Sequence, residues 1–271
     1  MNDYLKDAPL GQSTPYVCHY DPDQLFAIPR SNSWQTRGHA TAPFQGCDIW
    51  NAYELSWLNP RGLPQVAMAE IRVPCESPFI IESKSFKLYL NSFNLSRFDT
   101  IETVHQHMVE DLSQVAGAPV SVSMRSVDEQ ACIAQLDGEC LDQLDVAIEH
   151  YEPAPRLLQT TPGDVIRQTL YSHLLKSNCP VTGQPDWASI RIDCLSAPLD
   201  REGLLKYLVS YREHGDFHEQ CVEQIFLDIL ENCQPRQLSV HARYVRRGGL
   251  DINPYRSTTA ESAVNSRLSR Q

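Results

Sequence analysis

The sequence runs through one pattern of loop, strand, helix and strand twice, and any fold proposed for it must accommodate this internal repeat. The first copy starts at residues 59–65 and continues into an apolar, alternating stretch over residues 66–73. The second starts at residues 179–186, about 120 positions later, and continues into a similar stretch over residues 188–192. Helical spacing then recurs at 101–112 and 217–230, and period-2 alternation at 120–125 and 238–243. A duplicated module is therefore predicted.

Each module is expected to be an α+β domain in which an antiparallel sheet carries its helices on one face. The modules are assigned to residues 48–150 and 151–271, with a proline-containing linker around residues 149–164. Residues 1–47 are rich in Pro, Ser, Thr, Gly and Asp and show little periodicity, so they are interpreted as an extended arm. Its Ile28, Pro29 and Arg30 are expected to pack on the core.

Two further segments are predicted to be helical. Trp50, Tyr53, Glu54 and Trp57 fall at i, i+3, i+4 and i+7, which is the spacing of one helix face. The apolar run at residues 170–175 predicts a helix that leads into the loop at 179–186. The aromatic stripe is interpreted as part of the core rather than as a cofactor site.

The two loops differ in chemistry. Cys179 and Asp186 stand on the second loop, and a thiol held near a carboxyl suits a nucleophile with a proton donor. The first loop has Asn59 and Gln65 at the matching positions, and their amides can neither attack nor donate a carboxylic proton. The first loop is therefore expected to be inert, and a complete site to need both halves. A structural thiol beside a turn-forming aspartate is the alternative that the spacing alone leaves open.

Charge and hydropathy exclude several classes of protein. The formal net charge of -11 argues against a nucleic-acid surface, which needs basic patches. No apolar run approaches the ~20 residues needed to span a bilayer. Residues 1–7 lack the basic-then-apolar pattern of a secretory signal. A cytoplasmic protein without membrane or direct nucleic-acid contacts is predicted.

The cysteine pattern bears on redox state and metal binding. The nine cysteines include no C-x-x-C pair and are irregularly spaced, which favours reduced thiols over a disulfide framework or a zinc ribbon. Cys194, Cys221 and Cys233 are the candidates for a zinc site, but their spacing is poor. No metal is expected.

Two short motifs bear on cofactors. His218 and Glu219 begin an H-E-x-x pattern, but Val222 stands where a zinc protease needs its second histidine, so that class is rejected. Residues 246–249 read Arg-Arg-Gly-Gly, which supplies charge and close backbone approach and suits a phosphate, although it is also typical of a turn after a strand. No G-x-G-x-x-G follows a strand, so a Rossmann site is not expected.

Three motifs together resemble one enzyme family. Residues 174–179 (Leu-Leu-Lys-Ser-Asn-Cys) with 184–187 (Gln-Pro-Asp-Trp) are similar to the active-site loop of the QueF nitrile reductases, the NADPH-dependent 7-cyano-7-deazaguanine reductases. Residues 82–89 resemble the signature octapeptide of that family, and residues 217–221 resemble the start of its substrate-binding helix. The resemblance extends from about residue 48 to residue 256, in the motif order of the long, two-module members.

The resemblance implies a fold and a reaction. It implies two tandem tunnelling-fold modules, assembly as a homodimer, and a role in the biosynthesis of queuosine, a modified nucleoside of tRNA. The nitrile of 7-cyano-7-deazaguanine would be reduced by two NADPH, through a covalent cysteine thioimide, to the primary amine 7-aminomethyl-7-deazaguanine. The alternatives are a thiol-dependent hydrolase, in which water resolves the thioimide, and a catalytically silent purine-binding module.

The resemblance also implies roles for residues. Cys179 would be the nucleophile, Asp186 the proton donor, and His218 a group for proton transfer or polarisation. Asp186 needs burial to remain protonated near neutral pH, and the adjacent Trp187 is expected to provide apolar cover. The purine would be bound by Ile80, Ile81, Glu82, His218 and Glu219. The NADPH contacts would come from Glu82, Ser83, Arg247 and Gly248, with Lys84 and Lys87 as further candidates for phosphate binding.

Overall fold

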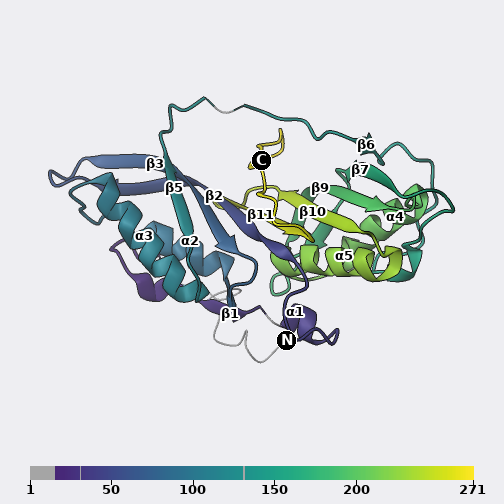
Figure 1. The fold of residues 1–271 in the computed structure, drawn as a ribbon. Helices are drawn as coiled ribbons and strands as arrows, with labels where there is room; N and C mark the ends of the chain where they lie inside the picture. Colours follow the sequence, from purple (N-terminus) through teal and green to yellow (C-terminus); the bar gives the residue numbers. More distant parts are fainter. Residues whose placement is uncertain (1–15, 31, 131) are drawn as a thin grey trace. The chain divides into compact units, whose positions relative to one another are not determined.

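The computed structural model describes residues 16–30, 32–130 and 132–271. They form two compact units (Figure 1). Unit 1 comprises the described residues up to 32 together with residues 48–130 and 246–251. Unit 2 comprises residues 33–47, 132–245 and 252–271. Each unit contains segments from distant parts of the chain and neither coincides with a predicted module, so the module boundaries at 48–150 and 151–271 stay a prediction.

Unit 1 is built from short and long strands with two helices. Its elements are η2 (Pro22–Gln24), β1 (Ala27–Pro29), β2 (Gln45–Leu58), β3 (Pro64–Pro74), β4 (Phe79–Ile81), α2 (Ser83–Ser92), α3 (Ile101–Ala116) and β5 (Ser121–Arg125). The strands lie in the order β5-β3-β2, and β1 pairs antiparallel with β4. Helices α2 and α3 lie on one side of these strands (Figure 1). Thr100 caps α3, and the left-handed Gly117 ends it.

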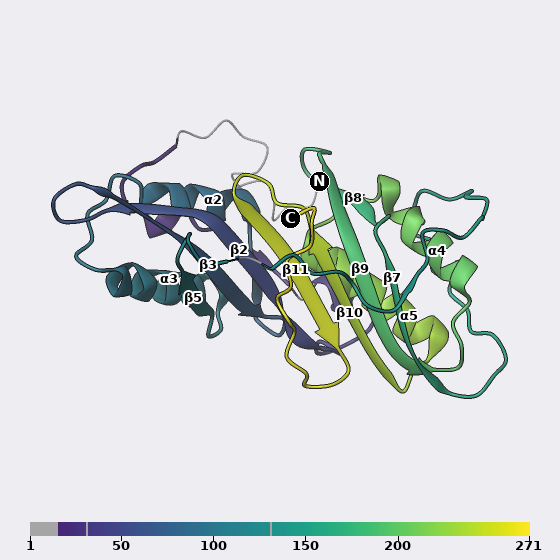
Figure 2. The ribbon, with the colours of Figure 1, turned by 90° about the horizontal axis from the view of Figure 1, so that it is seen from above.

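Unit 2 is a larger sheet with two long helices. Its elements are α1 (Asn32–Gln35), β6 (Glu139–Cys140), η3 (Pro155–Leu157), β7 (Ile166–Ser172), β8 (Lys176–Asn178), β9 (Pro185–Ser196), α4 (Arg201–Val209), η4 (Ser210–Glu213), α5 (His218–Cys233), β10 (Gln237–Tyr244) and β11 (Leu250–Ser257). The strands follow the order β11-β10-β9-β7-β6, with β8 paired to β9. Figure 2 shows β11, β10, β9 and β7 side by side. All these pairs are antiparallel except the short β6–β7 contact.

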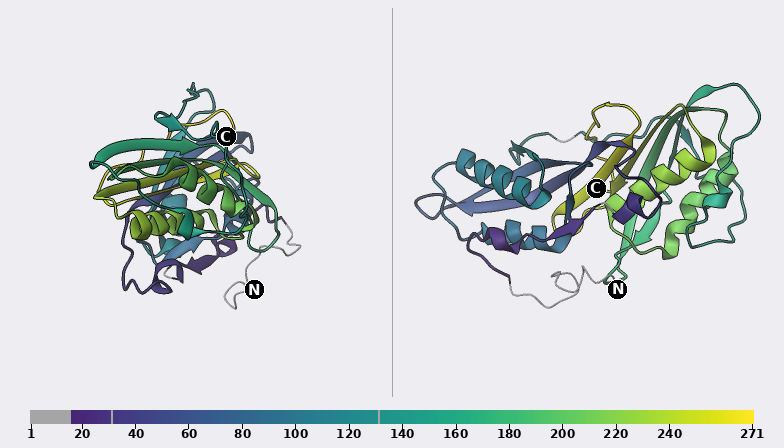
Figure 3. Two further views of the ribbon diagram at one scale, coloured as in Figure 1. Left: turned by 90° about the vertical axis from the view of Figure 1, so that its right-hand side faces the viewer. Right: turned by 60° about the horizontal axis from the view of Figure 1, so that its bottom comes forward.

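The sheet of unit 2 has one apolar face. Alternate residues of the central strands are buried, such as Ile190 and Ile192 of β9 and Val240 of β10. They pack toward α5, whose Ile225 and Ile229 are also fully buried. Both α4 and α5 lie on this face (Figure 3). The α+β class with antiparallel sheets and helices on one face is thus confirmed.

The predicted helix over residues 50–57 is wrong, because this segment lies within strand β2. Trp50 and Ala52 are buried while Tyr53 and Glu54 are more open, and burial then resumes at Leu55. Aromatic residues favour strands as well as helix cores, so four matches to a helical spacing could not separate the two.

The predicted helix over residues 170–175 is also wrong. Leu170 lies in β7, paired with Ile192 of β9, and the strand ends at Ser172. A short apolar run suits a buried strand as well as a helix, and the ladder to β9 satisfies its backbone. The predicted helices at 101–112 and 217–230 are confirmed as α3 and α5, and the predicted strands at 120–125 and 238–243 as β5 and β10.

The two repeated loops close with the same kind of backbone hydrogen bond, although the second loop is one residue longer. Asn59 donates its backbone N–H to the carbonyl of Leu63 at 3.0 Å, and Cys179 donates its N–H to the carbonyl of Gln184 at 2.8 Å. A glycine with positive φ sits inside each turn, Gly62 at 84° and Gly183 at 67°. This backbone conformation favours glycine. The repeat seen in the sequence therefore corresponds to a shared local geometry.

The part of the arm around residues 27–30 is fastened to unit 1, whereas residues 33–47 belong to unit 2. Strand β1 pairs with β4, and Ile28 is fully buried. The guanidinium of Arg30 lies 2.7 Å from the Asp48 carboxylate, with both side chains buried. The expected packing of residues 28–30 on the core is confirmed, whereas residues 1–7 lie outside the described residues. In the described ranges, no helix has the length and apolarity that crossing a membrane requires.

Candidate active site

The hairpin of β8 and β9 places Cys179 and Asp186 on one face. Ser177 pairs with Asp186 in the β8–β9 register, and the ladder continues through the bond from Cys179 N–H to Gln184. Residues two apart on a strand share a face, so Cys179 lies diagonally opposite Asp186 on the same side of the hairpin. Both are buried, at 7% and 4% exposure. The thiol and the carboxyl are therefore held close together away from bulk water.

The backbone before Cys179 is held on its other side as well. Asn178 donates its N–H to the carbonyl of His214 at 2.8 Å and accepts from the N–H of Asp216 at 3.1 Å. The ammonium of Lys176 donates to the Asn178 side-chain oxygen and to the carbonyl of Arg212, both at 2.6 Å. Strand β8 is thus fixed between β9 and residues 212–216, which limits the movement of the thiol.

Helix α5 brings His218 to the carboxyl. His218 is the first residue of α5, and its Nε2 lies 3.3 Å from Asp186 Oδ2. The two side chains are only 11% and 3% exposed. The Nδ1 atom of His218 is buried and has no hydrogen-bond partner among the described residues. An imidazole and a carboxyl at this distance can share or exchange a proton, which is what a general acid needs.

The groups next to this pair stay uncharged near neutral pH. Burial raises the pKa of Cys221 to about 12, and the charge of the nearby Asp216 adds to the effect. Burial also raises the pKa of Tyr244 well above its usual value. The expectation that Cys221 binds no metal stays untested, although no cluster of three or more metal-ligating side chains occurs in the described part of the chain.

Trp187 does not cover Asp186, and this expectation is wrong. Trp187 follows Asp186 in strand β9 and is 41% exposed, whereas Asp186 is buried. Successive strand residues point to opposite faces, so the indole turns away from the carboxyl. It lies instead under the guanidinium of Arg212, whose Cζ is 5.8 Å from the ring centroid. The burial of Asp186 comes from its place on the helix-covered face.

Glu219 follows His218 in the first turn of α5 and is 2% exposed. A carboxylate at this position is favoured by the partial positive charge of the helix N-terminus. The structure therefore places a second buried acid directly beside His218 in the chain.

Glu82 caps a helix in unit 1. Its two carboxylate oxygens accept hydrogen bonds from the N–H groups of Lys84 and Ser85, both at 2.7 Å, and the residue is fully buried. Burial raises the pKa of Glu82 above its ordinary value, although the two amide donors and the charges of Lys87 and Lys84 oppose the shift. Each carboxylate oxygen can accept more than one bond, so capping leaves acceptor capacity.

Ile80 and Ile81 precede this cap in β4. Both are 1% exposed, and they pair with Ile28 and Ala27 of β1. Neighbouring strand residues face opposite ways, so both faces of β4 are covered. Their backbone, rather than open side chains, fixes the start of α2.

The predicted NADPH contacts in unit 1 lie together. The turn at residues 246–249 closes between Arg247 and Leu250, whose backbones exchange hydrogen bonds at 2.8 and 3.3 Å. Gly248 has φ of +60°, and a Cβ added there would lie 3.2 Å from Cδ of Lys87 on α2. Ser83 starts that same helix. The glycine turn therefore packs against the first turns of α2, and a side chain at 248 would fill the space between them.

Positive charge gathers at this turn. Arg246 is exposed, with its Cζ 4.9 Å from the Tyr53 ring, while Arg247, Lys84 and Lys87 are partly exposed. Guanidinium and ammonium groups beside a helix N-terminus suit a phosphate. This arrangement fits the phosphate groups of a dinucleotide.

Sequence reasoning missed two residues of the site. Tyr244 stacks on His218, and Ser177 is fully buried opposite Asp186. The period-2 pattern of β10 gives the face on which Tyr244 lies, but nothing in the spacing joins it to a residue on α5. Only the tertiary packing reveals the contact.

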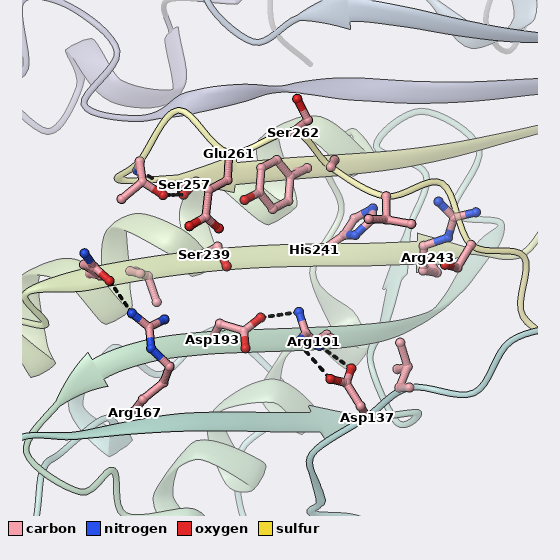
Figure 4. Close-up of a pocket in the computed structure, with 18 of the residues that line it drawn as sticks. Asp137, Arg167, Arg191, Asp193, Ser239, His241, Arg243, Ser257, Glu261 and Ser262 are labelled. Atoms are coloured by element: carbon pink, nitrogen blue, oxygen red, sulfur yellow. Dashed lines mark hydrogen bonds and ion pairs between the residues drawn. The ribbon is translucent and has the colours of Figure 1, made fainter.

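A pocket of 480 Å³ lies on the opposite face of the unit 2 sheet and contains none of the predicted site residues (Figure 4). Several of its charged side chains have partners within the pocket. Arg191 contacts Asp193 and, at 2.9 Å, Asp137. Arg167 donates to the Gln237 side chain at 2.5 Å. Strand alternation separates this polar face from the face that carries Asp186.

Family models and curated relatives of similar sequence point to the same family. Residues 16–124 match the family model described as "Nitrile reductase, 7-cyano-7-deazaguanine-reductase N-term", and residues 185–263 match one described as "QueF-like protein". The chain is 56% identical over 256 residues to the NADPH-dependent 7-cyano-7-deazaguanine reductase of Bordetella parapertussis, covering 93% of this chain and 94% of that one. It is 55% identical over 269 residues to the same-named protein of Dechloromonas aromatica, covering 97% and 95%. The solved apo structure of an archaeosine synthase QueF-Like aligns with a TM-score of 0.32 at 17% identity, covering 37% of this chain and all of that one.

Proposed function

The chain belongs to the nitrile reductase family of NADPH-dependent 7-cyano-7-deazaguanine reductases, and we propose that it carries out the reaction through a covalent adduct on Cys179. It is an oxidoreductase that converts the nitrile of 7-cyano-7-deazaguanine to the primary amine in queuosine biosynthesis, with NADPH as co-substrate. The observation that supports the covalent route is that Asp186 lies 3.3 Å from His218 and shares one face of the β8–β9 hairpin with the thiol.

The first step is addition of the Cys179 thiolate to the nitrile carbon. A carbon–sulfur bond forms, one π bond of the nitrile opens, and its electron pair moves to nitrogen. That nitrogen takes the proton of the Asp186 carboxyl, which leaves a carboxylate and a neutral thioimide. His218, 3.3 Å away, can return a proton to Asp186 for later steps.

Reduction of a nitrile to a primary amine takes four electrons, and NADPH supplies them as two hydrides to carbon. The protein must therefore provide two protons to nitrogen and hold the carbon–sulfur bond until the first reduction is complete. The thiol leaves when the reduced adduct collapses to an imine, and the second reduction gives the amine. The buried setting of Cys179 and Asp186 keeps water from hydrolysing the thioimide.

We propose that unit 1 binds NADPH through its glycine turn and the start of α2. Gly248 leaves space that a Cβ would fill, and Arg247, Ser83, Lys84 and Lys87 lie around it. Backbone and cationic groups at a helix start are suited to phosphate. Glu82, which caps the same helix, would act there as an orienting acid.

We propose that Glu82 and Glu219 accept hydrogen bonds from the purine. The deazaguanine edge presents N–H and amino donors, and two buried carboxylates match them. Analogues without those donors would leave buried acceptors unpaired, which gives selectivity. Ile80 and Ile81 would contribute backbone rather than side-chain contacts. The tunnelling-fold arrangement, the homodimer and a cytoplasmic location stay predictions.

A mass measurement tests the covalent step. The protein is mixed with 7-cyano-7-deazaguanine under anaerobic conditions without NADPH, and it is expected to gain the mass of one ligand. Cys179→Ala should show no gain. Cys233→Ala is the matched control, because Cys233 is also 7% exposed and lies in the same unit, and it should gain mass like the unaltered protein.

The same experiment separates reduction from hydrolysis. With NADPH added, the reductase must consume two NADPH for each amine formed. Formation of an acid or amide without NADPH consumption would contradict reduction. Full turnover by Cys179→Ala would contradict the covalent route but not the activity.

A further inference from the structure

A tyrosine outside the predicted site lies flat against His218. Tyr244 ends strand β10 and is fully buried. Its ring centroid is 3.8 Å from that of the imidazole, and the two planes are within 1° of parallel. Stacking of this kind covers one face of the imidazole and leaves the nitrogens at its edge open to partners.

The hydrogen bonds of His218 do not fix the plane of its ring. Nε2 meets Asp186 at 3.3 Å, while Nδ1 is without a partner among the described side chains. The last torsion of a histidine is broad and roughly two-fold, so one edge contact allows the ring to rock or flip. A flat surface against the ring removes that freedom. The stacked tyrosine provides such a surface.

Tyr244 is itself firmly held. It pairs with Ala188 in the β9–β10 register. Its backbone N–H donates to the Asn253 side chain at 3.2 Å, and its carbonyl accepts from the Gln271 side-chain amide at 3.1 Å. Gln271 also donates to Asn253 at 2.7 Å, which joins the two contacts.

The hydroxyl of Tyr244 is directed to other groups than its ring. It interacts with Ser177 and Cys221 rather than with His218. A phenylalanine would therefore keep the contact with His218.

We propose that Tyr244 is a positioning residue for nitrile reduction, whose ring face holds the His218 imidazole in the orientation that directs Nε2 to the Asp186 carboxyl. This inference rests on the proposed function. Tyr244 acts through His218 and does not touch the reacting atoms. It determines how often the proton-transfer geometry is met, so it affects kcat rather than substrate binding.

Two substitutions separate the ring from the hydroxyl. Tyr244→Phe keeps the aromatic face and is expected to retain kcat within about twofold. Tyr244→Leu fills similar space without a flat surface, and it is expected to lower kcat about tenfold with KM for the nitrile nearly unchanged. If the leucine variant does not fold, Tyr244→Met provides the same comparison. Equal losses in the phenylalanine and leucine variants would overturn the role of the ring face.

A matched control exists on the other face of the sheet. Tyr255 is 7% exposed and contacts His241 at a centroid distance of 5.5 Å, in the strand next to β10. Tyr255→Leu also removes a buried tyrosine beside a histidine but leaves the site alone. It should match Tyr244→Leu in loss of thermal stability and keep its kcat. A tenfold lower kcat in this variant would assign the effect to general loosening of the sheet.

A double-mutant cycle with His218→Ala decides whether Tyr244 acts through the imidazole. Tyr244→Leu is expected to have no further effect on kcat once His218 is removed. The same tenfold loss in both backgrounds would overturn the inference while leaving the proposed function in place. Absence of nitrile reduction in the unaltered protein would instead overturn the proposed function, and this role with it.

Discussion

At the scale of single residues, the site depends on how burial and pairing act on a few ionisable groups. Asp186 is buried and faces His218 at 3.3 Å, and Glu82 is buried and bonded to two backbone amides. Both side chains are carboxyls, but Asp186 faces a histidine that can exchange a proton, whereas Glu82 accepts from backbone amides that cannot. Asp186 is therefore suited to move a proton, and Glu82 to accept hydrogen bonds.

Replacing the proton donor should stop most of the turnover. Asp186→Asn keeps the shape of the side chain but cannot supply a carboxylic proton, so we expect kcat to fall by roughly 10²- to 10⁴-fold. Asp193→Asn is the control on the same strand, since Asp193 lies on the opposite face and pairs with Arg191. NADPH oxidation with the nitrile measures both. A kcat for Asp186→Asn within threefold of the unaltered protein would remove Asp186 from the mechanism.

The raised pKa of Glu82 gives the fold a defined pH dependence. Burial makes the native state hold this proton more tightly than the unfolded chain, whose carboxyl has the ordinary value of 4.5. The stabilising effect of protonation is therefore present at low pH and is lost as pH rises through the native pKa. Relative to Glu82→Gln, the free energy of unfolding should fall from pH 4.5 upward. Urea denaturation across this range measures it, and a constant or growing difference would contradict the sign.

At the scale of elements, the chemistry is carried by turns that join regular segments. The β8–β9 turn presents the thiol, the start of α5 presents the histidine, and the turn at 246–249 packs against α2. In each case a fixed backbone sets the position of the residue. A substitution that alters the backbone of one of these turns should therefore affect only the step that this turn serves.

Gly248→Ala should weaken NADPH binding selectively. The added Cβ would meet Lys87 at 3.2 Å, and φ of +60° is strained for alanine. We expect KM for NADPH to rise about tenfold while adduct formation with the nitrile is retained, a change of about 1.4 kcal/mol. Gly38→Ala is the control, because Gly38 also has positive φ but open space around its Cβ position.

Steady-state kinetics and the adduct mass distinguish the two glycine variants. Both should lose about 1 kcal/mol of stability from strain, yet only Gly248→Ala should change KM for NADPH. An unchanged KM in that variant would exclude the turn at 246–249 from cofactor binding.

At the scale of the whole molecule, two compact units each have a core, and unit 2 contains a buried ion pair that ties helix to strand. Arg256 on β11 donates to Glu223 on α5 at 2.7 and 3.2 Å, and both side chains are fully buried. A buried charge that loses its partner is costly, whereas a matched apolar replacement of both is often tolerated. This pair is therefore a sensitive reporter of unit 2.

Arg256→Met should lower the free energy of unfolding by about 3–5 kcal/mol because it leaves Glu223 buried without its guanidinium. The double variant Arg256→Met with Glu223→Leu should recover part of that loss. Urea denaturation followed by circular dichroism measures both. A double variant that is less stable than the single one would show that the attraction between Arg256 and Glu223 exceeds the free energy needed to bury the two charges.

Much of this organisation could be predicted from the sequence. The long helices and the period-2 strands were found because their patterns are long, and the repeated loops because they carry distinctive residues. Residues 50–57 and 170–175 were misassigned because short apolar or aromatic runs fit a helix and a buried strand equally. The Tyr244–His218 contact could not be predicted, since it joins a strand to a helix through packing alone.

The β8–β9 hairpin finally sets a limit on how this enzyme can change. Ser177 pairs with Asp186 and Asn178 with Pro185, so six residues close the loop between them. Loss or gain of one residue in that loop would shift the pairing by one position. Because β9 is also held by β7 and β10, the short strand β8 would turn over, and Ser177 and Cys179 would point away from the face that carries Asp186. The length of this loop is thus under as strict a constraint as the identity of the cysteine. The loop can tolerate point substitutions rather than insertions.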